Sequence, residues 1–230
     1  MTATKPLPQG EEKVRAVRAM FDAIAPRYDL VNRIMTFGLD IRWRRRAVRS
    51  LGLAPGSTIL DAAAGTGDLC RVLSAAGLHP VGFDLSFGML AHARTAAPLL
   101  QADALRLPFP DAAADGLVSG FALRNFVDLG AFLRETARVV RPGGRIALLD
   151  VAEPDNPVLK AGHAFYFGKV VPRIGGLLSD AAAYRYLPQS VAYLPDRTTL
   201  LASVAEAGFT SVEHRLLSGG ITQLITGTRS

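Results

Sequence analysis

The fold of this chain is decided by the stretch Ile59-Leu60-Asp61-Ala62-Ala63-Ala64-Gly65-Thr66-Gly67-Asp68. Its first residues form an apolar run that predicts a buried strand, and the small residues after it predict a glycine turn that leads into a helix. Small residues at such a turn let a ligand contact the backbone. The three-glycine spacing of dinucleotide sites and the Lys-Ser/Thr pair of phosphate loops are both missing, so phosphate is not the expected ligand.

The same alternation of apolar runs and helical segments continues to the C-terminal residues. Strands are predicted at 58–62, 80–84, 99–102, 117–120, 145–151, 211–217 and 222–228, and helices at 69–76, 87–95, 129–140 and 198–207. The runs are apolar nearly throughout, which is typical of parallel strands covered on both faces. We therefore expect an α/β domain over 52–230 with a mostly parallel seven-stranded sheet, and a proline- and aromatic-rich cap insertion at about 152–195.

Residues 11–51 are predicted to form a helical N-terminal segment on the substrate side, preceded by a disordered tail at 1–10. Helices are expected at 11–24, at 28–37, and from an N-cap at Asp40 to residue 51. The net charge of +6 arises here, because residues 1–50 hold 11 Lys and Arg against 5 Asp and Glu. Four arginines form a stripe at helical spacing, which is either a solvated helix face or an anion- or membrane-facing surface: Arg42, Arg45, Arg46 and Arg49.

The composition limits which cellular compartment, disulfides and metal sites are expected for this chain. The single cysteine, Cys70, excludes an internal disulfide and is expected to be a small buried apolar residue. Four scattered histidines lack the spacing of a zinc site, so no metal is expected. No secretory signal and no apolar run long enough to span a membrane are seen, which favours a cytoplasmic protein.

Acidic residues follow the next two predicted strands. Asp84 ends the second strand, where a carboxylate can accept two hydrogen bonds from a ribose, and Asp103 with Ala104 follows the third, where an adenine could be bound. This ordered set resembles the class I S-adenosylmethionine-dependent methyltransferases, which have a Rossmann-like fold. The resemblance implies S-adenosyl-L-methionine as the cofactor, held by Asp61, Gly65, Thr66, Gly67, Asp84, Leu85, Asp103, Ala104 and Gly120.

Motifs over residues 14–229 narrow the resemblance to one family. They are Met20-Phe21-Asp22, Ala25-Pro26-Arg27-Tyr28-Asp29, Asn32, Gly38, Trp43, residues 105–111, Leu123-Arg124-Asn125, Pro154, Asn156-Pro157, Pro172-Arg173-Ile174-Gly175, Tyr184-Arg185-Tyr186-Leu187, Ser190, Pro195-Asp196, Ala207-Gly208-Phe209 and Gly219-Gly220-Ile221. Together they resemble the ubiquinone/menaquinone biosynthesis C-methyltransferases. The resemblance implies C-methylation of a reduced isoprenoid quinone ring, with conversion of demethylmenaquinol to menaquinol as the expected reaction.

That chemistry needs an in-line methyl group and an electron-rich ring whose phenol loses or shares its proton. We hypothesise that Arg124 stabilises the developing phenolate, Asn125 orients it or a water, and Tyr28 relays a proton. The simpler interpretations are a surface ion pair for Arg124 and a core aromatic residue for Tyr28. Asp150 either faces the substrate or caps the following loop.

Three departures from the family pattern keep alternatives open. Asp40-Ile41 replaces a common His-Arg, Gly120 and Ala122 flank Phe121 in place of Ser and Gly, and Ile225-Thr226-Gly227 replaces His-Lys-Gly. A relative that methylates another phenolic or polyketide-derived ring is the second hypothesis, and a non-catalytic cofactor-binding module is the third. No motif for methylating nucleic-acid amines is present, so nucleic acid is not an expected partner. A peripheral contact with an anionic membrane and a homodimer are further expectations.

Overall fold

The predicted strands form one seven-stranded sheet in the order β3-β2-β1-β4-β5-β7-β6. The computed structural model describes residues 8–180, 183, 186 and 189–230. The strands are β1 (Thr58–Ala62), β2 (His79–Asp84), β3 (Leu99–Gln101), β4 (Ala114–Gly120), β5 (Val140–Val151), β6 (Phe209–Leu217) and β7 (Thr222–Arg229). Strands β1 to β5 are parallel, and β7 runs antiparallel to both β5 and β6. The strand order reverses between β1 and β4, which places the ligand crevice at the carboxyl ends of these strands.

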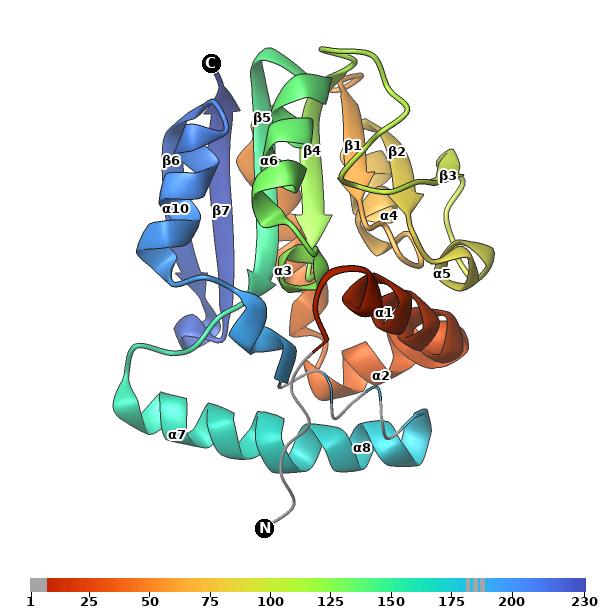
Figure 1. Cartoon of the computed structure of the whole chain (residues 1–230), viewed down its shortest axis with the longest axis vertical. Coiled ribbons are helices and arrows are strands. Elements are labelled where there is room, and N and C mark those ends of the chain that lie inside the picture. The colour runs from red at the N-terminus through yellow and green to blue at the C-terminus, as the bar shows by residue number, and fades with distance from the viewer. Residues whose placement is uncertain (1–7, 181–182, 184–185, 187–188) are drawn as a thin grey trace.

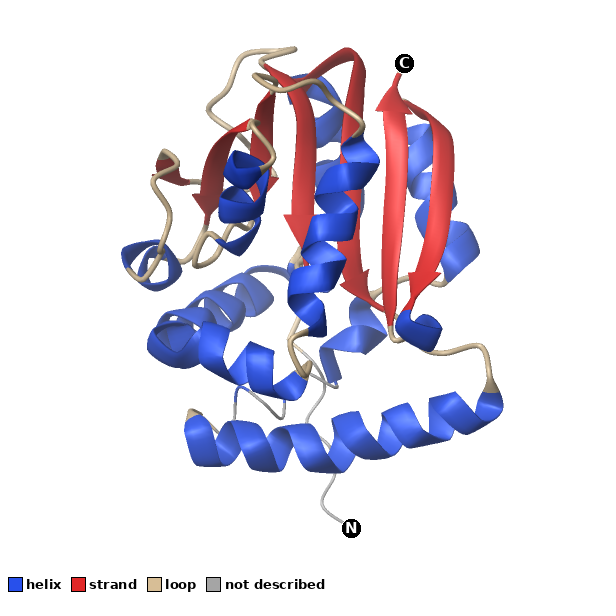
Figure 2. Ribbon diagram, turned by 180° about the vertical axis from the view of Figure 1, so that it is seen from behind, coloured by secondary structure: helices blue, strands red, loops and turns tan. Residues whose placement is uncertain are grey.

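Helices cover both faces of the sheet (Figures 1 and 2). Helices α3 (Leu39–Leu51) and α4 (Asp68–Ala75) bury one apolar cluster against one face, which includes Trp43, Leu51 and Leu73. Helices α6 (Leu129–Val139) and α10 (Arg197–Glu206) bury a second cluster on the other face, which includes Phe132 and Val204. Apolar burial on both faces explains why the strands are apolar throughout rather than alternating.

The N-terminal helices and the cap lie at the carboxyl edge of the parallel strands (Figure 1). Helix α1 (Gly10–Ile24), the turn η1 (Ala25–Arg27) and α2 (Tyr28–Met35) face the cap helices α7 (Pro157–Phe165), η3 (Tyr166–Val170) and α8 (Val171–Leu178). A third apolar cluster joins the two segments, with Ile24, Val31 and Met35 packed against Val171 and Ala183. Shorter elements are α5 (Phe87–Ala91), η2 (Leu123–Asn125), η4 (Val191–Tyr193) and η5 (Ser218–Gly220).

The α/β fold, the mostly parallel seven-stranded sheet and the helices on its faces confirm the expected fold class. Some boundaries differ. Strand β5 begins at Val140 rather than at 145, because the pairing with β4 shifts register and absorbs the glycine-rich residues between. Helix α5 ends at Ala91, four residues early. Residues 1–7 of the expected tail lie outside the described residues, and Gly10 already belongs to α1.

The prediction that Asp40 caps the third helix was wrong. The N-cap is Gly38 at φ +73°, and Asp40 lies within α3 at 1% exposure. Its carboxylate forms ion pairs with the half-buried Arg33 and the buried Arg44. A buried guanidinium requires a counter-ion, so Asp40 pairs with these arginines and does not cap the helix. The four arginines of the predicted stripe are exposed. Within the described residues, no helix has both the length and the apolar character needed to cross a lipid bilayer.

Candidate active site

The glycine turn after β1 has the backbone that its sequence demands. Gly65 and Gly67 have φ values of +56° and +81°, in the left-handed region that side chains disfavour. A Cβ atom on Gly67 would lie 2.6 Å from Cγ2 of Thr95, and one on Gly65 would lie 3.0 Å from Cε of Met89. Glycine is therefore favoured at both positions. Gly65 lines a cavity at this turn, which we call the cofactor cavity, and Gly67 shapes the turn without lining the cavity.

Asp61 presents an unpaired carboxylate oxygen at this cavity. It is fully buried, its Oδ2 accepts a hydrogen bond from Sγ of Cys70 at 3.2 Å, and its Oδ1 has no partner among the described residues. Burial raises the pKa of the Asp61 carboxyl to about 7. A buried acceptor without a donor is costly, so Oδ1 suits a polar or cationic group of a ligand. Cys70 is thus more than the apolar filler that we predicted.

Asp84 stiffens the turn from the next strand. Its Oδ2 accepts from the Gly65 backbone N–H at 2.9 Å, and its Oδ1 accepts from the Ser86 N–H at 2.8 Å. Burial raises the pKa of this carboxyl. Both oxygens thus accept one backbone hydrogen bond and keep lone pairs free for the ribose hydroxyls that the sequence predicts there.

Most of the predicted cofactor residues meet in one cavity. It is lined by Asp61, Gly65, Thr66, Asp84, Leu85, Asp103, Ala104 and Gly120. Gly67 does not line it and acts through the turn geometry alone. Asp103 is exposed, and its Oδ1 accepts from the Leu105 N–H at 2.9 Å, so the carboxylate also shapes its own loop. These features fit S-adenosylmethionine.

Helix α1 covers this cavity, which sequence reasoning missed. Val17, Arg18 and Phe21 contribute to the lining. The helix is fastened to α5 by Asp22, whose Oδ1 accepts from the Gly88 N–H at 2.8 Å and from the Ser86 hydroxyl. The motif Met20-Phe21-Asp22 was the available signal, but a helical pattern does not show what lies opposite the helix.

A second cavity of about 370 Å³ adjoins the first. The two share four lining residues: Phe21, Tyr28, Arg44 and Phe121. Phe121 has φ +64°, and the Arg44 guanidinium lies 5.3 Å from its ring centre. A bulky residue in that backbone region is strained, and such strain gathers where a site requires one position for a side chain. We refer to the second cavity as the acceptor cavity.

Arg124 lies at the acceptor cavity within a buried ion pair, not on the surface. It is 5% exposed and pairs through Nη1 with Asp150, which is fully buried. Nη1 also donates to the Phe121 carbonyl at 2.7 Å, and Nε donates to Oγ of Ser190 at 3.1 Å. Nη2 has no acceptor within the described part of the chain. Asp150 therefore pairs with Arg124, which answers the question of its role that the sequence left open.

Tyr28 lies at the junction of the two cavities, and Asn125 lies on the cofactor side. Asn125 lines the cofactor cavity, and its Oδ1 accepts from the Tyr186 hydroxyl at 3.5 Å. Burial raises the pKa of Tyr186 to about 12, so this hydroxyl keeps its proton. Tyr28 lines both cavities and packs edge-on against Phe21, with ring centres 5.9 Å apart.

A network of charges supports the wall between the cavities. Asp68 at the start of α4 accepts from Nη2 of Arg33 at 2.8 Å and pairs with Arg71, while Arg44 lies 3.5 Å away. Thr66 of the glycine turn donates its hydroxyl to Asp29. Arg44 was counted among the N-terminal charges, but its burial was not predicted, because helical spacing alone does not reveal an ion pair.

The described cap helices bring two polar side chains, those of His163 and Tyr166, to the acceptor cavity. His163 lines the acceptor cavity, its buried Nε2 has no hydrogen-bond partner among the described residues, and burial lowers its pKa. The Tyr166 hydroxyl donates to the Met35 carbonyl at 2.8 Å and ties the cap to α2. Of the other aromatic residues in the cap, Phe167 lines the acceptor cavity, whereas Tyr184 lies outside the described residues.

Comparison with known proteins agrees with this geometry. The model of the ubiE/COQ5 methyltransferase family matches residues 8–229. The chain belongs to this family. A curated relative from Syntrophotalea carbinolica, named ubiquinone/menaquinone biosynthesis C-methyltransferase UbiE, is 46% identical and covers 93% of this chain and 94% of its own. A demethylmenaquinone methyltransferase from Thermus thermophilus is also 46% identical and covers 91% of this chain and all of its own length, 100%.

A solved structure shares the fold of this chain. A SAM-dependent methyltransferase of Thermotoga maritima superposes with a TM-score of 0.61 at 18% identity, covering 93% of this chain and 99% of that chain. The family model and the curated relatives confirm the expectation of an S-adenosylmethionine-dependent C-methyltransferase at the level of the family.

The departures from the family pattern fall in different surroundings. Asp40 lines the acceptor cavity, and Gly120 and Ala122 line the cofactor cavity. By contrast, Ile225-Thr226-Gly227 lies within β7, paired with β5. The first two changes thus border the cavities, whereas the third belongs to the sheet.

Proposed function

We propose that this enzyme methylates a ring carbon of a reduced isoprenoid quinone and converts demethylmenaquinol to menaquinol. The observation that carries the proposal is the acceptor cavity, which is largely apolar and shares lining residues with the cofactor cavity. A flat aromatic ring with an apolar tail matches such a lining. The names of the relatives from Thermus thermophilus and Syntrophotalea carbinolica support the same substrate class.

The catalytic task of the chain is to make the ring carbon nucleophilic. S-adenosylmethionine supplies the activated methyl group. The free Nη2 edge of Arg124 stabilises negative charge as the phenol loses its proton, and Asp150 fixes the guanidinium in position. Because Arg124 remains protonated, it does not act as the base. Asn125, oriented by Tyr186, positions the phenol or a water. Tyr28 relays the phenol proton to water.

A methylation assay tests this proposal. Purified enzyme is given labelled S-adenosylmethionine with reduced demethylmenaquinone, with a reduced benzoquinone precursor, or with the oxidised forms of both as controls. We expect methylated naphthoquinol only after reduction, and Arg124→Lys is expected to lower turnover while cofactor binding persists. Cofactor binding without product from either quinol would refute the proposal.

We further propose that the enzyme takes its substrate from a membrane surface. Large apolar side chains are exposed beside the acceptor cavity: Phe37 is 79% exposed and Val158 is 80% exposed, and both line it. Leu177 on α8 is 86% exposed. An apolar rim of this kind inserts into the interface of a bilayer. Exposed arginines, such as those of α3, are attracted to anionic headgroups.

Vesicle co-sedimentation tests the membrane proposal. Binding is expected to rise with the fraction of phosphatidylglycerol in phosphatidylcholine vesicles and to fall when Phe37 is changed to Asp. Charge reversal of the exposed arginines of α3, which are Arg42, Arg45, Arg46 and Arg49, is expected to remove the dependence on phosphatidylglycerol. Binding that ignores both changes would contradict it.

A further inference from the structure

A buried lysine connects the cofactor-covering helix to the turn that carries Arg124 and Asn125. Lys13 lies in the first turns of α1 and is only 4% exposed. Its Nζ donates to the Arg124 carbonyl at 3.0 Å and to the Phe126 carbonyl at 2.8 Å. The ring of Tyr193 covers the same ammonium, with its centre 3.7 Å from Nζ. Three segments far apart in the sequence therefore meet at one charge.

The two carbonyls belong to a helix end that needs a donor. The turn η2 closes through the Asn125 N–H to the Ala122 carbonyl at 2.8 Å, and its last carbonyls project without a helical partner. Within the described residues, no backbone N–H donates to the Arg124 or Phe126 carbonyl. A cation at a helix C-terminus satisfies such groups. Lys13 thus donates hydrogen bonds to the carbonyls of the residues before and after Asn125.

The rest of the contact holds the lysine in place. The Tyr193 hydroxyl donates to the Pro8 carbonyl at 2.6 Å, so the ring beneath the ammonium is tied to the residues just before α1. Burial lowers the pKa of Lys13 to about 8, which leaves the side chain mainly protonated at neutral pH. An ammonium that is kept buried between two carbonyls and a ring has a fixed direction, unlike a solvated surface lysine.

We propose that Lys13 is a positioning residue that couples closure of α1 over the cofactor to the conformation of the turn carrying Arg124 and Asn125. The same helix lines the cofactor cavity through Val17 and Phe21. Closing the helix over the cofactor therefore delivers the ammonium to the turn and orders the acceptor side. This inference rests on the proposed roles of Arg124 and Asn125.

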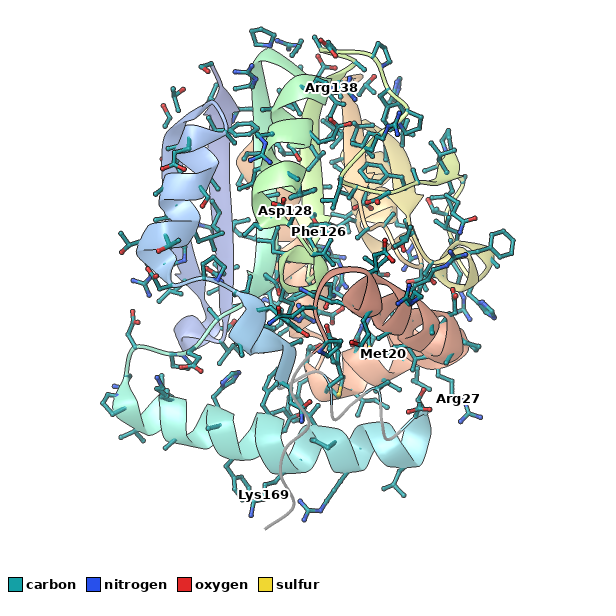
Figure 3. All side chains as sticks on the ribbon, in the orientation of Figure 1. Met20, Arg27, Phe126, Asp128, Arg138 and Lys169 are labelled. Atoms are coloured by element: carbon teal, nitrogen blue, oxygen red, sulfur yellow. The ribbon has the colours of Figure 1, made fainter. Side chains whose placement is uncertain are left out.

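The test compares Lys13→Met, Lys13→Arg and a control, Lys169→Met. Lys169 is an exposed lysine whose side chain points away from the body of the molecule (Figure 3). Each variant is examined for kcat, for the KM of reduced demethylmenaquinone, for the Kd of S-adenosylmethionine and for amide hydrogen exchange of residues 123–127. The exchange experiment uses the enzyme with S-adenosylmethionine and without quinol, so it does not depend on the identity of the substrate.

We expect Lys13→Met to lower kcat at least tenfold and to speed exchange in the turn at least tenfold, with KM and Kd changed less than threefold. Lys13→Arg, which keeps a cation and its donors, is expected to recover more than a third of the wild-type kcat. The control is expected to match wild type. A Lys13→Met enzyme with kcat within twofold of wild type, or with unchanged exchange in the turn, would overturn the inference.

Two further outcomes are separable. If Lys13→Met does not fold, Tyr193→Leu carries the test, because it removes the ring beneath the ammonium and leaves Lys13 present; unchanged kcat and turn exchange in that variant overturn the inference. If the wild-type enzyme methylates no quinol, the proposed function fails, and faster exchange in the turn of Lys13→Met still supports the coupling.

Discussion

The buried pair of Arg124 and Asp150 allows the structural and the catalytic roles of the arginine to be separated. Asp150 has no exposed surface, and its Oδ1 accepts from the Val151 N–H at 2.7 Å in addition to pairing with Arg124. Changing Asp150 to Asn keeps the shape and removes the charge. The guanidinium then stays buried without a counter-ion, and an amide NH2 group faces N–H donors.

The size of the effect follows from the burial of both partners. Breaking a buried ion pair from one side costs about 3–5 kcal/mol of unfolding free energy. For a chain of this length, about 2–4 °C are lost per kcal/mol, so Asp150→Asn is expected to lower Tm by roughly 6–20 °C. Calorimetry and urea unfolding measure the loss. An exposed pair such as Arg215 with Glu213 is the matched control, and its removal is expected to cost about 0–1 kcal/mol.

A double variant then isolates the catalytic part. Arg124→Met combined with Asp150→Leu removes both charges, so it is expected to recover part of the lost stability. Recovery is incomplete because the backbone N–H groups of Arg124 and Val151 lose their acceptor. This folded protein is expected to bind S-adenosylmethionine and to show no turnover. A Tm of Asp150→Asn within 2 °C of wild type would refute the burial argument, and turnover by the double variant would refute the role of Arg124.

Three other perturbations follow from the cofactor cavity. Because burial raises the folded pKa of Asp61 to about 7, the native state keeps a proton that the unfolded state releases, and the carboxyl lowers the free energy of unfolding as pH rises from 5 to 8. In urea unfolding of the cofactor-free enzyme, the unfolding free energy of Asp61→Asn is therefore expected to rise relative to wild type by up to about 3 kcal/mol over that range. A difference that is constant with pH would contradict this. Gly67→Ala is strained by its φ of +81° and by contact with Thr95, so it is expected to lower the free energy of unfolding by about 1–3 kcal/mol in thermal unfolding and to weaken cofactor binding. The control Gly168→Ala, with open space around its Cβ, is expected to be neutral or slightly stabilising. Equal effects of the two changes would argue against the strain. Asp22→Ala releases α1 from α5 and is expected to raise the Kd of S-adenosylmethionine about tenfold by calorimetric titration, and an unchanged Kd would mean that the helix does not close the cavity.

Local sequence was enough for the sheet and the glycine turn. The apolar runs of β1 and β2 and the glycines at 65 and 67 impose their structure on neighbouring residues, through burial and through backbone conformations that only glycine adopts easily. The predicted start of β5 was wrong because register with β4 decides where that strand begins. The predicted end of α5 was also wrong, since the helix ends at Ala91.

The cofactor side was predictable for a related reason. Strand ends in a parallel sheet meet at one edge, so Asp61, Asp84 and Asp103 could be placed together from strand order alone. The candidate residues Arg124, Asn125 and Tyr28 were found through the resemblance to a family. Their roles stay proposals.

Only the tertiary structure decided which groups hold these residues. The sequence predicts Asp40 as a helix cap, but it is a buried counter-ion. It predicts Cys70 as an apolar residue, but the thiol donates to Asp61. Asp150 had two open interpretations, and it pairs with Arg124. Lys13 reads as one charge on an amphipathic helix, yet it donates to a carbonyl 111 residues away. Periodicity and spacing report what a residue does to its neighbours in the chain, whereas a buried charge is defined by the partner that the fold brings to it.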